Sequence, residues 1–208
     1  QVNDLSLMVG FNRRFSPHIK LIKNSIINST DPINLVITMN AGAIPLDHWV
    51  HDMKVGGGRI IGEACHSLDV CVYLSGSLIK SVCMNSLGES PIENTDNASL
   101  LLKFENGSNA VINYFSNGSK AYSKERVEVF SNEKTWIIDN YRTTKVYGAK
   151  SSNFKTKIDK GHKNQFNKYI LHLINGGESI IPFHQLVNVT RASFKLIESM
   201  KSNQWVNL

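Results

Sequence analysis

The sequence predicts an α+β domain built on a large, mostly antiparallel, open sheet with helices on one face. The first observation is a series of six short β-rich runs, at residues 78–87, 98–104, 109–115, 125–131, 134–139 and 142–147. Turn-forming residues separate these runs, and short turns of this kind join antiparallel neighbours. The second observation is a set of segments whose apolar residues recur every three or four positions, as in helices that bury one stripe. Such helices would cover one face of the sheet and leave the other open.

A helix is predicted over residues 16–28. Ser16 is a suitable N-terminal cap, and Pro17 suits the first turn because its missing N–H costs no hydrogen bond there. The apolar residues of this helix are Ile19, Ile22, Ile26 and Ile27. Asp31-Pro32 follows and ends the helix.

Residues 33–43 alternate well enough to predict the first strand. The side chains on one side are those of Ile33, Leu35, Ile37 and Met39. Further along, Glu105-Asn106-Gly107 and Ser131-Asn132-Glu133-Lys134 both predict hairpin turns between neighbouring runs.

The open face of the sheet is expected to carry apolar residues. Within run 109–115, Ile112 and Tyr114 lie on one side, and Val111, Asn113 and Phe115 lie on the other. An apolar face of this kind is commonly buried against another protein surface, so oligomerisation is expected, with modest exposure in a monomer as the alternative.

Two helices are predicted to close the chain, over residues 161–175 and 184–201. Gly176-Gly177 and Pro182 mark the connection between them. The expected buried stripe of the second helix consists of Leu186, Val189, Phe194, Ile197 and Met200.

The composition narrows the class of protein. With 208 residues, of which 41% are hydrophobic, the chain can bury a full core as one domain. No apolar run approaches the roughly 20 residues that a bilayer-spanning helix needs, so no membrane association and a cytoplasmic location are expected. The three cysteines form no CxxC pair, which argues against a zinc site or a disulfide framework. The net charge of +6 indicates an anionic partner, but no motif or aromatic pattern favours a nucleic acid.

Residues 56–69 hold the most informative pattern, three glycines that lead into an amphipathic helix. Glycines allow a sharp turn and let a ligand approach the backbone closely. The helix that follows directs the free N–H groups of its N-terminus toward the same ligand position. The expected core stripe is Ile61, Ala64, Cys65, Leu68 and Val72. On the other face, Glu63, His66 and Asp69 follow at three-residue spacing, which predicts that His66 lies between two carboxylates. A carboxylate neighbour tunes an imidazole for acid–base chemistry, although a packed or solvated histidine is the plainer alternative.

Residues 47–52 place two histidines and two carboxylates directly before the glycines. A metal site would need His48 and His51 on one face of a helix. Pro45 and the glycines favour a loop instead, and no third ligand is evident, so no metal is expected.

Three segments carry motifs of a known enzyme family. Residues 56–66 are similar to a substrate-side motif in which GGG, a short apolar step and an Asp-x-x-x-His pair open a long helix. Residues 9–17 are similar to a GxNRRFxP stretch at the exit of a nucleotide-binding domain, and residues 159–163 and 181–183 to a closing helical pair. These motifs resemble the glucose-fructose oxidoreductase / inositol dehydrogenase / MocA family, and the closing pair resembles a branch fused to a second dehydrogenase module. One departure is that the family's usual aspartate falls on Gly62, so the nearest carboxylate is Glu63.

The resemblance implies the substrate-binding and oligomerisation domain of an NAD- or NADP-dependent dehydrogenase that acts on a sugar, sugar acid or nucleotide-sugar. His66 would take the hydroxyl proton as the hydride leaves for nicotinamide, while Glu63 or Asp69 orients the ring. The implied pocket residues are Arg13, Arg14, His48, Trp49, Gly57, Gly58 and Asp69. The indole of Trp49 suits the C–H face of a sugar, and a packed surface loop is an equal alternative. One of the two adjacent arginines would bind an anionic group, while the other makes a structural ion pair.

The nucleotide-binding half of such an enzyme has no counterpart in these residues. No G-x-G-x-x-G motif follows a strand, and no Glu-Lys-Pro tripeptide occurs, although the family uses the lysine of that tripeptide with the histidine. The resemblance therefore implies that residues 1–12 are a residual segment of a Rossmann domain and that 13–208 form the substrate domain. The fragment alone is expected to be inactive.

Two other functions stay open. The same sheet could serve a non-enzymatic carbohydrate-binding or assembly module, which the departure at Gly62 permits. A nicotinamide-independent lyase or epimerase could use His66 and Glu63 alone. Substitution of His66 separates the three, because only the binding module would keep its function, and only the lyase would work without nicotinamide.

Overall fold

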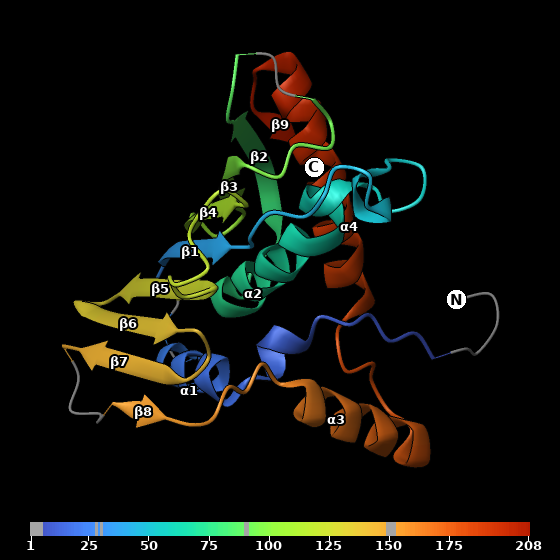
Figure 1. Ribbon diagram of the computed structural model, residues 1–208. Coiled ribbons are helices and arrows are strands. Elements are labelled where there is room, and N and C mark those ends of the chain that lie inside the picture. The colour runs from blue at the N-terminus through green and yellow to red at the C-terminus, as the bar shows by residue number, and fades with distance from the viewer. Residues whose placement is uncertain (1–5, 28, 30, 90–91, 149–152) are drawn as a thin grey trace.

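The centre of the molecule is one nine-stranded sheet. The computed structural model describes residues 6–208 except 28, 30, 90–91 and 149–152. Its strand order is β8-β7-β6-β5-β1-β4-β3-β2-β9 (Figure 1). Neighbouring strands are antiparallel except β1 and β4, which are parallel. The α+β class with a mostly antiparallel open sheet is therefore confirmed.

The seven longer strands match the predicted runs closely. They are β1 (Asn34–Asn40), β2 (Ile79–Ser86), β3 (Ala98–Phe104), β4 (Asn109–Phe115), β5 (Glu125–Ser131), β6 (Lys134–Asp139) and β7 (Thr143–Tyr147). Two further strands, β8 (Phe154–Lys155) and β9 (Val206–Asn207), were not predicted. Two residues are too few to show the alternation by which a strand is recognised.

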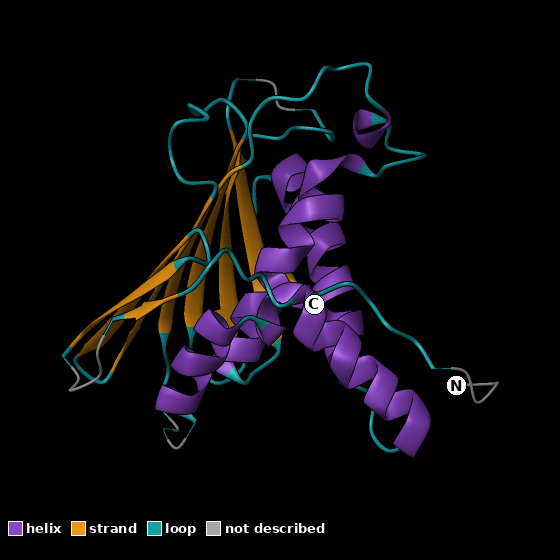
Figure 2. Cartoon of the chain, turned by 60° about the horizontal axis from the view of Figure 1, so that its bottom comes forward, coloured by secondary structure: helices purple, strands orange, loops and turns teal. Residues whose placement is uncertain are grey.

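The helices lie on one side of the sheet (Figure 2). They are α1 (Pro17–Ile26), α2 (Cys65–Ser75), α3 (His162–Asn175) and α4 (Phe183–Ser202). Shorter turns are the 3-10 helices η1 (Asn12–Phe15) and η2 (Trp49–His51) and the π-helical turn η3 (Ile60–Ala64). The predicted start of α1 is confirmed, since the Ser16 hydroxyl accepts a hydrogen bond from the His18 N–H at 3.3 Å and Pro17 occupies the first turn.

The core lies between the sheet and these helices. Ala64, Leu68 and Val72 are buried as predicted, whereas Ile61 and Cys65 are only half-buried. The predicted burial of Phe194 was wrong, because this side chain is 54% exposed. Ile27 follows the last residue of α1 and is 62% exposed. The remaining members of the α4 stripe are buried, and Leu196 completes it; Phe194 lies five positions after Val189, which turns it away from the sheet.

The other face of the sheet is partly open and partly apolar. Val111 of β4 lies beside Val36 of β1 and Leu101 of β3, and Leu101 is 39% exposed. None of the helices in the described part of the chain is both long and apolar enough to cross a membrane.

Candidate active site around His66

His66 lies in the first turn of α2, where η1 packs against this helix and against α3 (Figure 1). The imidazole is half-buried, and the ring of Phe11 meets its edge at a centroid distance of 5.8 Å. Its Nδ1 is buried and makes no hydrogen bond within the described residues, so the accessible part of the ring is the opposite edge. Burial, reinforced by the positive charge of Arg13, lowers the pKa of His66 to about 4. The ring is therefore neutral at pH 7 and can accept a proton.

The glycine turn before α2 adopts the conformation that its sequence permits. Gly57 and Gly58 have φ of +72° and +76°, a region that other residues rarely adopt. Gly56 makes a close backbone approach, because a Cβ there would lie 2.6 Å from the carbonyl oxygen of Trp49. The helix then opens with the π-helical turn η3, a feature that often occurs at functional sites.

Glu63 is bonded to groups other than His66. Arg59 donates a hydrogen bond to it at 2.9 Å, and the Tyr114 hydroxyl donates another at 2.7 Å. Burial alone would raise the pKa of Glu63, but these two donors and the charge of Arg59 hold it below its usual value. Arg59 is itself buried and also donates to the carbonyl of Gly42 and to Asp96. Glu63 thus belongs to a polar network that ties the start of the helix to β4.

Asp69 is bonded to Arg14. The Nε of Arg14 donates to both carboxylate oxygens at 3.0 and 3.1 Å, and its Nη2 donates at 2.5 Å. Both side chains are almost fully buried, and Arg14 also donates to Gln185. Burial raises the pKa of Asp69 to about 6, against the lowering effect of Arg14. Of the two adjacent arginines, Arg14 thus makes a structural ion pair.

The expected hydrogen bond between His66 and a neighbouring carboxylate is not made. Glu63 is bonded to Arg59 and Tyr114, and Asp69 to Arg14. The wider π-helical turn η3 changes the angular spacing between Glu63 and His66. Asp69 follows His66 within the regular helix α2, but the buried Arg14 takes both of its carboxylate oxygens.

Arg13 forms a second ion-pair cluster beside His66. Its Nε donates to Glu125 at 2.6 Å and its Nη2 at 3.1 Å, and the Nζ of Lys160 donates to the same carboxylate at 2.5 Å. Burial alone would raise the pKa of Glu125, but the bonds and charges of Arg13 and Lys160 keep it lowered. Sequence reasoning missed Glu125 and Lys160. Glu125 alternates with the apolar Val127 and Val129 on the inner face of β5, and a charged residue in such a position is an indication of a buried ion pair.

His48 and Trp49 lie in the loop before the glycines, at the start of η2. Trp49 is 60% exposed, and its ring lies 5.7 Å from that of His48. His51 is buried, and neither of its ring nitrogens has a hydrogen-bond partner in the described part of the chain. Within the described ranges, no group of three or more histidines, cysteines and carboxylates is arranged to hold a metal ion.

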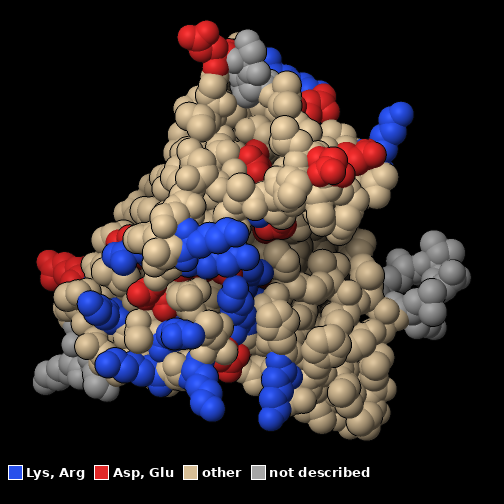
Figure 3. Space-filling view, in the orientation of Figure 1, with Lys and Arg blue, Asp and Glu red and all other residues tan. Residues whose placement is uncertain are grey.

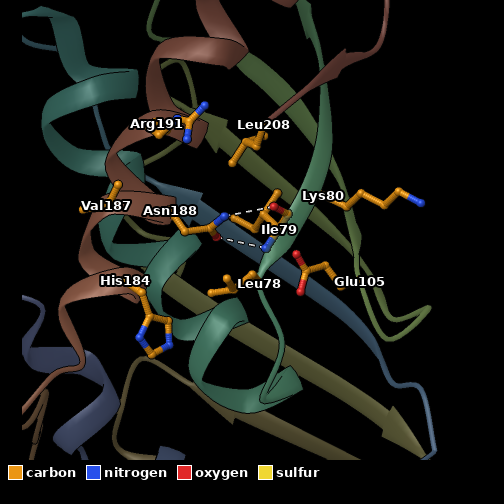
Figure 4. Close-up of a pocket in the computed structure, with 9 residues that line it drawn as sticks. All are labelled: Leu78, Ile79, Lys80, Glu105, His184, Val187, Asn188, Arg191 and Leu208. Carbon is orange, nitrogen blue, oxygen red and sulfur yellow. Dashed lines mark hydrogen bonds between the residues drawn. The ribbon is translucent and has the colours of Figure 1, made fainter.

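A separate pocket of about 260 Å³ lies between α4 and the start of β2 (Figure 4). The amide of Asn188 bonds both backbone groups of Ile79 there, accepting from its N–H at 2.9 Å and donating to its carbonyl at 3.0 Å. Exposed side chains line its mouth, and the pocket shares no residue with the His66 cluster.

Basic side chains gather on the face of the molecule shown in Figure 3, mainly over the half that contains α1 and β6 to β8. Arg13 and Lys160 belong to η1 and to the loop before α3. The candidate site therefore combines the neutral imidazole of His66 with the positive charges of Arg13 and Lys160.

The comparisons with known proteins agree with this architecture. The family model described as the GFO/IDH/MocA C-terminal domain matches residues 31–137. The chain is 33% identical over 149 residues to the uncharacterized oxidoreductase YrbE of Bacillus subtilis (strain 168), which is 68% of this chain and 42% of that protein. It is 30% identical over 153 residues to the myo-inositol 2-dehydrogenase of Thermotoga maritima, which is 69% of this chain and 44% of that enzyme. The chain thus spans less than half the length of these relatives.

Among solved structures, a levoglucosan dehydrogenase in complex with NADH and levoglucosan has the same fold. The TM-score is 0.80 at 16% sequence identity, over 100% of this chain and 68% of that one. The family match covers half of the chain, and the sequence relatives agree with it. The chain belongs to the GFO/IDH/MocA C-terminal domain family of oxidoreductases.

Proposed function

We propose that this chain is the substrate-binding domain of an NAD(P)-dependent dehydrogenase that acts on a sugar, sugar acid or nucleotide-sugar. The relatives support the reaction class: one is a myo-inositol 2-dehydrogenase, and the levoglucosan dehydrogenase was solved with NADH. The observation that carries the proposal is the state of His66, a neutral imidazole with one edge buried and the other accessible.

In this proposal, His66 acts as the general base. Its accessible edge accepts the proton of the substrate hydroxyl, and the ring returns the proton in the reverse direction. Phe11 packs against the ring edge and holds its orientation. The ion pairs of Glu63 and Asp69 fix the start of the helix that carries His66, so these carboxylates position the helix rather than the ring.

The remaining predicted residues would shape the pocket. Gly57 and Gly58 leave the turn free of side chains, and the exposed indole of Trp49, with His48 beside it, offers a surface for a sugar ring. Arg13 lies in η1, which packs against the helix that carries His66, and we assign it to a polar group of the substrate. We propose that nicotinamide, which accepts the hydride, is held mainly by a nucleotide-binding domain, because the 208 residues contain no G-x-G-x-x-G motif. The half-buried His66 fits a cofactor presented from outside this domain.

We also propose that a second copy of the chain covers the open face of the sheet. The row formed by Leu101, Val111 and Val36 supports this assembly, because it exposes apolar surface across neighbouring strands.

The experiment compares the full polypeptide with its His66→Asn variant. Reduced nicotinamide is followed by absorbance with a panel of sugars, uronic acids and nucleotide-sugars. We expect kcat to fall by about 100-fold or more in the variant, the usual loss for a general base. The matched control is His184→Asn, at an exposed histidine in the separate pocket, which should keep full activity.

Other outcomes would favour the alternatives. Undiminished turnover in His66→Asn would contradict the assigned base. Conversion of a substrate without nicotinamide would indicate the lyase or epimerase. Sugar binding without turnover, with the cofactor bound, would indicate the carbohydrate-binding module.

A further inference from the structure

Two cations share one buried carboxylate beside His66. Glu125 is almost fully buried, and both Arg13 and Lys160 donate to it. One carboxylate can neutralise only one of the two cations. The cluster therefore keeps one uncompensated positive charge, which is costly in a partly buried position unless a ligand provides an anion.

The donors that remain free belong to these same two cations. Arg13 uses Nε and Nη2 for Glu125, and its Nη1 makes no hydrogen bond to another described residue. This nitrogen is also absent from the buried unpartnered atoms of the described chain, so solvent reaches it. The Nζ of Lys160 uses one of its three donors on Glu125, and its side chain is 21% exposed.

The charge lies within reach of the proposed reaction centre. Arg13 and Glu125 both affect the protonation of His66, and so does the exposed His162 at the start of α3. The packing places the cluster there as well, because Phe11, two residues before Arg13, contacts the His66 ring and η1 packs against α2. A neutral sugar would offer only hydroxyls to Arg13 and Lys160.

We propose that the site selects a substrate with a carboxylate, bound by Nη1 of Arg13 and Nζ of Lys160. This inference rests on the proposed function and names its substrate class, a sugar acid. A carboxylate matches the single uncompensated charge better than a phosphate dianion does. Arginine and lysine together would hold it through charge-assisted hydrogen bonds, which are the stronger kind.

The test measures binding by calorimetry, on the full polypeptide, so that it does not depend on turnover. Probes come in matched sets that differ at one carbon: D-glucose, D-glucuronate and D-glucose 6-phosphate, with the galactose equivalents. We expect at least one uronate to bind about 10-fold or more tightly than its neutral parent and its phosphate, and the preference to shrink at high salt.

The decisive variant is Lys160→Gln, because it leaves Arg13 and Glu125 as a neutral pair. The ratio of uronate affinity to neutral-sugar affinity should fall from about 10 to about one in this variant. The matched control is Lys163→Gln, an equal charge change at an exposed residue outside the cluster. Melting curves of both variants check that the fold is kept.

Three results would overturn the inference: equal affinity for uronate and parent, a preference that survives in Lys160→Gln, or binding of no anionic member of the panel. Tighter binding of the phosphates would assign the site to a phosphorylated sugar and reject the carboxylate. If a uronate binds as expected but no nicotinamide is reduced, the proposed dehydrogenase fails while the substrate class stands.

Discussion

At the scale of single residues, the partners of each charged group determine what it can do. Arg13 and Arg14 are neighbours in sequence, yet Arg14 is committed to Asp69 in the interior whereas Arg13 keeps a donor free beside His66. Both arginines make ion pairs, and the prediction that one of them binds an anionic group stays a prediction, for which Arg13 is the candidate.

The lowered pKa of His66 has a consequence for stability. The imidazole titrates near pH 6.5 in the unfolded chain and near pH 4 in the folded one. Between these values the unfolded state binds a proton that the folded state does not, so stability falls as the pH decreases from about 6.5 to about 4. His66→Gln should remove this part of the acid sensitivity.

Urea unfolding at pH 7 and pH 4.5 measures the effect. The unsubstituted protein should lose more of its unfolding free energy between the two pH values than His66→Gln does. The same substitution at the exposed His184 is the control and should behave like the unsubstituted protein. Equal losses in all three proteins would show that the histidine is not buried as described.

At the scale of elements, the turn before α2 requires a positive φ at Gly57, and substitutions can test this requirement. Gly57 has φ of +72°, where an L-residue costs about 1–2 kcal/mol, so Gly57→Ala should destabilise the protein by that amount. Gly62 lies within the helical segment at negative φ, and the nearest atom to an added Cβ is 3.5 Å away. Gly62→Ala should therefore be neutral or stabilise by up to about 1 kcal/mol. Chemical unfolding distinguishes the two, and equal effects would contradict the described turn.

Most elements could be predicted from the sequence because their causes are local. Alternation and turn residues placed β1 to β7, and the Ser16 cap placed α1. The two-residue strands could not be found, since their hydrogen bonds depend on partners elsewhere in the sheet. The π-helical turn η3 left no recognisable pattern, and it redirected Glu63.

The candidate site was predictable only in part. His66 stands in a motif, so resemblance identified it. Its surroundings join distant residues: 112 positions separate Arg13 from Glu125, and 51 separate Glu63 from Tyr114. A single sequence does not show which distant residues pair. It shows only that a charged residue on the buried face of a strand, such as Glu125, needs a partner.

At the scale of the whole molecule, the open face of the sheet carries the apolar row of Leu101, Val111 and Val36, and no helix of the described residues covers it in Figure 2. If a second copy covers it, a charge in the centre of this face should separate the copies. Val111→Asp is expected to convert the oligomer into a monomer, as measured by light scattering after size-exclusion chromatography. Val187→Asp, on the helical side, is the matched control and should leave the mass unchanged. A monomeric unsubstituted protein would rule out the assembly.

The amide of Asn188 has a further effect on how copies of this chain can associate. By bonding both backbone groups of Ile79, it occupies the places that another strand would use, and Leu208 and β9 do the same for the residues that follow. Residues 79–82 on the outer rim of β2 are therefore closed to strand addition. A second copy therefore cannot add a strand directly to residues 79–82 of β2, where a helix side chain and the C-terminal strand already hold the backbone.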